Sequence, residues 1–142
     1  MLHPVPGMTG ASGTGTAKVM VDTVADSLVS TVSFSGLSGK TTEAHIHGPT
    51  AVAFVTPGDV IVNYAASLKL GVMAESFTQT DTIPAGLYAA LTDGKAYVNI
   101  HTDKFPEGEI LGFFTPCPTT TSFSGAVASK QGSLRKVVVE SS

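Results

Sequence analysis

Charged residues are scarce in this 142-residue chain, and their scarcity excludes several classes of protein. Lys, Arg, Asp and Glu make up 13% of the residues and the formal net charge is −3, so no nucleic-acid partner is expected. No apolar run approaches the roughly 18 residues that a membrane-spanning helix needs, so no membrane span is expected. The chain is 42% hydrophobic and long enough for one globular domain with a sizeable core.

Cysteine is almost absent, since Cys117 is the only one, and an intrachain disulfide is therefore excluded. The first residues, MLHPVPGMTGASG, lack the basic start and the apolar middle of a signal peptide. Either the chain is intracellular, or its signal peptide was removed and is not present in this numbering. Little lysine and arginine, with much Thr, Ser, Gly and Val, favours an extracellular or secreted domain.

The residue pattern of the sequence also gives no indication of long helices. Fifteen glycines, eight prolines and many β-branched residues favour short strands between turns. In SLVSTVSFSG, the side chains of Leu28, Val32 and Phe34 share one face, which is typical of a half-buried antiparallel strand. LKLGVMAESF is expected to form another strand, and IPAGLYAALTDGK one short helical turn. About eight or nine short strands predict an all-β sandwich or Greek-key barrel.

Two of the four histidines lie one residue apart in the strand-like stretch TEAHIHG. Its alternation places Glu43, His45 and His47 on one face. Residues two apart on a strand have Cβ atoms roughly 6.5–7 Å apart, so both imidazole rings can lean toward one ion.

A third histidine lies in KAYVNIHT, where Tyr97, Asn99 and His101 share a face. Three neutral imidazoles, those of His45, His47 and His101, suit copper or zinc and leave one position open for water or a substrate. Asn99, and Tyr97 beside it, are then candidates for residues that orient a ring from behind. The alternative is a metal-free cluster whose imidazoles lock loops through hydrogen bonds, which is common in ordinary β-proteins.

Other catalytic chemistry has little support. No serine lies in a nucleophile elbow, and neither a phosphate loop nor a dinucleotide fingerprint is present. Asp103, Glu107 and Glu109 cluster in TDKFPEGE, where a solvated hairpin turn is expected rather than a calcium site. Because no complete catalytic set is found, no enzymatic activity is predicted.

Three stretches in order resemble the chordin-type (CHRD) domain: GTGTAKVMVD, LVSTVSFSGLSGKTTEAHIHGP and GKAYVNIHTDKFPEGEILG. The resemblance covers residues 13–114. It implies a Greek-key, immunoglobulin-like β-sandwich similar to that of copper/zinc superoxide dismutase. It also implies an extracellular binding or assembly module, because the family has no established enzymatic activity.

The likeness to dismutases bears on the histidines. Dismutases hold copper with a His-x-His pair and a later strand histidine, which His45, His47 and His101 match in order and strand context. The dismutase's fourth histidine has no counterpart within residues 50–99, and His3 supplies a fourth ligand only if the N-terminal arm folds back. Dismutase activity is therefore not expected, whereas a copper or zinc site stays open.

The C-terminal region departs from the CHRD pattern. A strand that usually opens such domains is missing, and a similar segment, TSFSGAVASKQG, appears near the C-terminus, followed by a last strand candidate, LRKVVVES. We therefore divide the chain into a CHRD-like sandwich, 1–116, and a C-terminal strand extension, 117–142. The extension completes a sheet in its own molecule or in the next one, or it only covers an existing edge. Exchange would make copies of this chain the partners, as head-to-tail oligomers or fibres, through Phe123, Ala126 and Val127.

Overall fold

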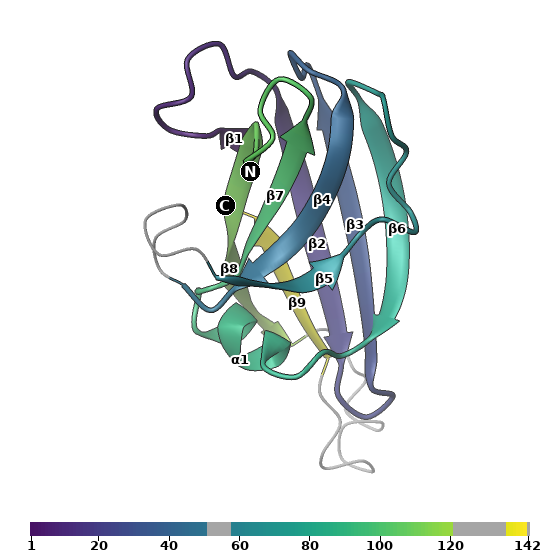
Figure 1. Ribbon diagram of the computed structural model, residues 1–142. Coiled ribbons are helices and arrows are strands. Elements are labelled where there is room, and N and C mark those ends of the chain that lie inside the picture. The colour runs from purple at the N-terminus through teal and green to yellow at the C-terminus, as the bar shows by residue number, and fades with distance from the viewer. Residues whose placement is uncertain (51–57, 121–135, 142) are drawn as a thin grey trace.

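A computed structural model describes residues 1–50, 58–120 and 136–141, with backbone alone for 116–120 and 136–141 (Figure 1). Strands dominate the described chain, as the glycine, proline and β-branched content predicts. The elements in chain order are β1 (His3–Pro4), β2 (Thr14–Asp22), β3 (Ser27–Ser35), β4 (Thr41–Gly48), β5 (Asp59–Asn63), β6 (Glu75–Thr82), α1 (Leu87–Thr92), β7 (Tyr97–Thr102), β8 (Ile110–Thr120) and β9 (Lys136–Ser141).

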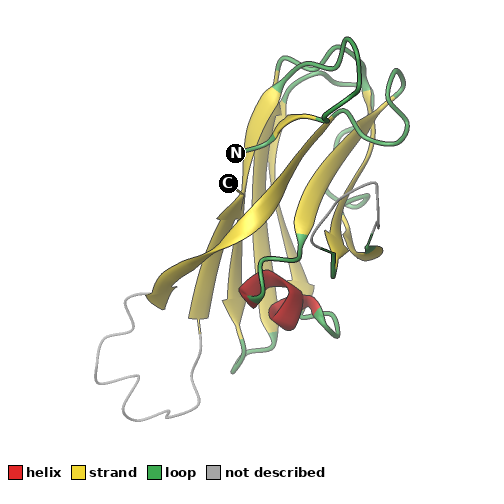
Figure 2. Cartoon of the chain, turned by 90° about the vertical axis from the view of Figure 1, so that its left-hand side faces the viewer, coloured by secondary structure: helices red, strands yellow, loops and turns green. Residues whose placement is uncertain are grey.

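The strands form two antiparallel layers that enclose one main core. The first layer has the order β5–β4–β7–β8, with β1 also paired to β8, and the second has the order β9–β2–β3–β6. β8 belongs to both, because its first part pairs with β7 and its later part with β9. Figure 2 shows α1 at one end of this sandwich. The predicted all-β sandwich is therefore confirmed.

The core lies between the layers and is built from alternate residues of the strands. Leu28, Val32 and Phe34 are buried on the inner face of β3, as their spacing predicts. Ala44 and Ile46 are buried in the same way on β4. Because side chains alternate along a strand, the histidines next to them in the sequence face the outer side of the first layer.

Two of the expected elements differ in the structure. LKLGVMAESF was expected to be a strand, but β6 begins only at Glu75, and the chain before it turns at Gly71, where φ is +76°. Leu68 packs into the core from this loop, so its hydrophobicity reflects burial without a strand. The helical turn is confirmed as α1, which has six residues. In the described residues, no helix is long and apolar enough to cross a membrane.

The last strand of the chain lies inside the sheet, between β8 and β2. β9 is antiparallel to both neighbours, with Lys18 opposite Glu140 on one side and Phe114 opposite Ser141 on the other. This is the LRKVVVES candidate, paired within its own molecule. The other candidate strand, with Phe123, Ala126 and Val127, lies outside the described residues, and exchange between molecules stays a prediction.

Glu109 is buried, although the sequence led us to expect it in a solvated turn. Its side chain is 0% exposed, although Glu107, two residues earlier, is exposed. The Glu109 carboxylate accepts backbone N–H groups from Ser12 at 3.3 Å, Ser38 at 2.7 Å and Gly39 at 3.2 Å, and a short bond from the Ser38 hydroxyl. The interpretation was wrong for Glu109 because this carboxylate ties the N-terminal arm and the β3–β4 connection to the start of β8.

The hydrogen bonds to Glu109 predict a dependence of stability on acid. Burial by itself would raise the pKa of Glu109, but hydrogen bonds from the Ser38 side chain and from three backbone N–H groups lower it below the ordinary value of 4.5. The stabilisation is therefore fully present above that value and is lost as the pH falls through the lower folded-state pKa. As the pH is lowered from about 5 to about 3, the free energy of unfolding measured with urea should decrease more for the native chain than for Glu109→Gln. Parallel pH profiles for the two proteins would contradict this.

Candidate metal centre

The candidate site is built on the outer face of two neighbouring strands, β4 and β7. Their antiparallel register places His45 opposite Asn99, His47 opposite Tyr97 and Glu43 opposite His101. Residues that are directly opposite in such a pair point to the same side of the sheet. The register therefore gathers on one face the three histidines that the sequence singled out.

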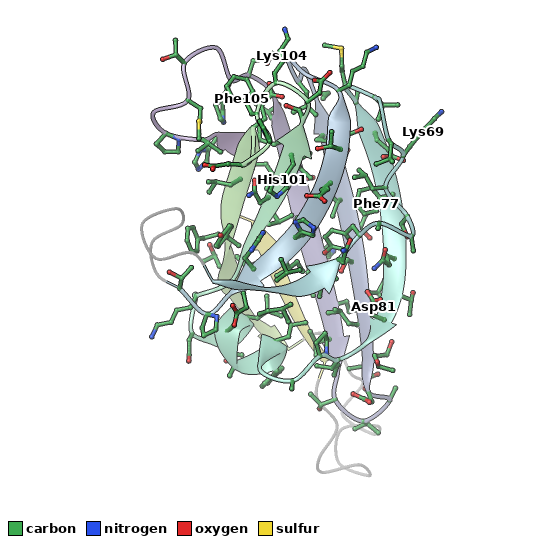
Figure 3. The ribbon with its side chains drawn as sticks, viewed as in Figure 1. Lys69, Phe77, Asp81, His101, Lys104 and Phe105 are labelled. Atoms are coloured by element: carbon green, nitrogen blue, oxygen red, sulfur yellow. The ribbon has the colours of Figure 1, made fainter. Side chains whose placement is uncertain are left out.

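The three imidazole rings converge. His45 Nδ1 lies 3.2 Å from His101 Nε2, and these two rings meet edge to face. One nitrogen from each of His45, His47 and His101 can be chosen so that all three lie within 4.8 Å of one another. Figure 3 shows His101 on β7, near the turn that carries Phe105.

Backbone carbonyls fix the protonation of two of the rings. His47 Nδ1 lies 3.2 Å from the Gly58 carbonyl oxygen, and His101 Nδ1 lies 2.7 Å from that of Pro106. A carbonyl oxygen only accepts, so each Nδ1 donates its N–H, and each neutral ring keeps its lone pair on Nε2. His47 Nε2 is buried and has no hydrogen-bond partner in the described part of the chain. This arrangement leaves nitrogen lone pairs ready for a ligand.

The surroundings of His45 and His47 favour their neutral, metal-binding form. Burial lowers the pKa of His45, and the neighbouring His101 and His47 lower it further. Burial also lowers the pKa of His47, although the Gly58 carbonyl opposes the change. Since a protonated imidazole has no free lone pair, these shifts keep both rings available at neutral pH.

Comparison with known protein families identifies the domain type. The sequence profile of the CHRD domain family matches residues 3–114. The chain belongs to the CHRD family. The match spans β1 to β7, all three clustered histidines and the start of β8, and it ends before β9. Searches of curated proteins and of solved structures found no significant match, so the implied likeness to the dismutase fold stays a prediction.

Two further predicted residues of the CHRD domain support the cluster in different ways. Tyr97 stacks on His47, with ring centroids 4.9 Å apart and an interplanar angle of 8°. Asn99 is buried, and its Nδ2 donates to the carbonyl of Glu107 at 3.2 Å, next to the Pro106 carbonyl that binds His101. Tyr97 thus orients a ring directly, whereas Asn99 holds the turn that orients another.

His3 is not part of the group that the structure brings together. It is exposed on β1, opposite Leu111 of β8, and its Nδ1 lies 3.0 Å from the carbonyl oxygen of Pro4. Within the described ranges, the histidine group of the CHRD domain contains His45, His47 and His101. The described N-terminal arm therefore does not bring His3 in as a fourth ligand.

The sequence did not reveal the two carbonyls that orient the rings. Gly58 lies so close to Gly48 that a side chain on Gly58 would collide with the Gly48 backbone. This close approach lets the Gly58 carbonyl reach His47. The only sequence signals were the glycine before Asp59 and the proline in KFPEG, and neither of them specifies a contact with a histidine.

Proposed function

We propose that this CHRD domain binds copper or zinc through His45, His47 and His101. The observation that carries the proposal is that one ring nitrogen from each of the three histidines lies within 4.8 Å of the other two. The Nε2 of His47 is also buried and has no hydrogen-bond partner among the residues that the structure describes. We further propose that the domain acts outside the cell, as a binding module without enzymatic activity. Its composition and the resemblance that the sequence revealed support this role.

The separations between the ring nitrogens suit a bound ion after a small rotation of one ring. Metal–nitrogen bonds of about 2.0–2.1 Å in a tetrahedral site place the ligand nitrogens roughly 3.3–3.4 Å apart. His45 Nδ1 and His101 Nε2 are already 3.2 Å apart. The longest separation in the group is at most 4.8 Å, so rotation of a ring that moves its nitrogen by about 1–1.5 Å completes the set.

Binding also requires a change of protonation at His45. Because His101 Nε2 carries a lone pair, His45 Nδ1 must carry the proton in the 3.2 Å contact between them. If His45 holds an ion through Nδ1, that proton would have to leave the ring or move to its Nε2. Copper or zinc, when bound, would supply a Lewis acid at the three imidazoles.

Replacing a ligand tests this function. The native domain should bind one copper or zinc ion at micromolar concentration or below, and His47→Ala should weaken binding by about 100-fold or more, since even residues that only orient a ligand contribute 10–100-fold. Isothermal titration with Zn(II) and competition titration with Cu(II) measure both affinities. His3→Ala is the matched control, because it removes an exposed histidine outside the group, and it should bind like the native chain. A native chain that binds neither metal, or a His47→Ala variant of native affinity, would overturn the proposal.

A second role, self-association, is favoured by the position of β9. This strand lies between β8 and β2, yet it follows the residues that match the CHRD family. Residues 121–135 separate it from β8, whereas antiparallel neighbours need connections of only about 2–5 residues. We propose that a second copy of the chain can supply β9 in exchange, joining molecules through the same backbone pairing.

A further inference from the structure

Glu43 lies next to the three histidines on the face that they share. It is directly opposite His101 in the β4–β7 ladder and two residues before His45 on the same strand. Directly opposed residues have Cβ atoms about 4.5–5.5 Å apart, which is within reach of a glutamate side chain. The ladder shifts register between Thr41 and Glu43, and such bulges re-aim side chains next to functional sites.

The carboxylate of Glu43 is available to a ligand. The side chain is exposed. Its carboxylate is not part of the group of ligand atoms within 4.8 Å of one another, so it has to swing toward the rings to reach an ion. An exposed carboxylate beside three imidazoles matches the donor types that zinc accepts.

We infer that Glu43 is the fourth ligand of this centre and makes it selective for divalent ions. The inference rests on the proposed metal function. Three neutral imidazoles leave the full charge of the ion uncompensated, and a carboxylate offsets one unit of it. Zn(II) and Cu(II) gain from a hard, charged oxygen ligand, whereas Cu(I) is soft and gains little from it.

Substitution of Glu43 by glutamine tests this assignment, because it keeps the shape and removes the charge. Zn(II), Cu(II) and Cu(I) affinities are measured by competition with chromophoric chelators, with a reductant present for Cu(I). In Glu43→Gln, Zn(II) and Cu(II) should bind about 10-fold or more weakly, and Cu(I) should change by less than about 3-fold. Glu107→Gln, which removes an equal charge from the exposed turn, should leave all three affinities within about 3-fold.

The outcomes separate this inference from the function on which it rests. A native chain that binds none of the three ions overturns the three-histidine site and the fourth ligand together. A native chain that binds Zn(II) with an affinity unchanged in Glu43→Gln overturns the fourth ligand alone. Equal weakening of Zn(II) and Cu(I) overturns the selectivity. A Cu(II) electron paramagnetic resonance spectrum that changes in Glu43→Gln but not in Glu107→Gln supports direct ligation.

Discussion

Replacing Glu109 by alanine is expected to lower the free energy of unfolding by about 3–5 kcal/mol. The Glu109 carboxylate is fully buried and accepts bonds from Ser12, Ser38 and Gly39. Without it, three backbone N–H groups and one hydroxyl lose their acceptor in a site that offers little access to water. Each unsatisfied buried donor costs about 1–3 kcal/mol, with partial relief where water enters.

Urea unfolding at pH 7, followed by far-UV circular dichroism, measures this loss. Glu107→Ala is the matched control, since it removes an exposed carboxylate two residues away, and its effect should stay within about 0.5 kcal/mol. Glu109→Gln should fall between the two, because the amide keeps one acceptor and replaces the other with a donor. A Glu109→Ala variant that loses less than about 1 kcal/mol would show that the carboxylate does not hold the loops together.

Deletion of residues 121–142 is expected to have the second large effect. It removes β9 and leaves unpaired backbone groups along β2 and along the later part of β8. Both become open strand edges, which destabilises the sandwich and promotes association. We expect a loss of about 3 kcal/mol or more, which corresponds to roughly 10 °C in Tm, together with oligomers or aggregates in size-exclusion chromatography.

A peptide added in trans separates closure within the molecule from exchange between molecules. A synthetic peptide that contains the residues of β9 should bind the deletion variant and restore its monodisperse behaviour. The same peptide with Val138→Pro should not, because proline lacks the N–H that pairing requires. Exchange also predicts that the full chain forms dimers or larger species as its concentration rises. A deletion variant as stable and monodisperse as the full chain would contradict a role for β9.

The alternation of residues in the sequence predicted the faces of the strands correctly. Leu28, Val32 and Phe34 lie in the core, and His45 and His47 share the outer face of β4. These predictions succeed because the period of two follows from local backbone geometry. The interpretation failed at Glu109, whose partners Ser12 and Ser38 are 97 and 71 residues away, since a local pattern does not specify what a loop meets after folding.

The sequence by itself determined the all-β class, the CHRD resemblance and the identity of the three histidines. Only the tertiary structure decided that they form one group, because the register between β4 and β7 brings His45 and His101 to 3.2 Å. It also decided which ring nitrogens carry the lone pairs, since the carbonyls of Gly58 and Pro106 accept from Nδ1 of His47 and of His101. Register and loop placement depend on pairing between distant segments, whereas strand faces depend only on neighbouring residues.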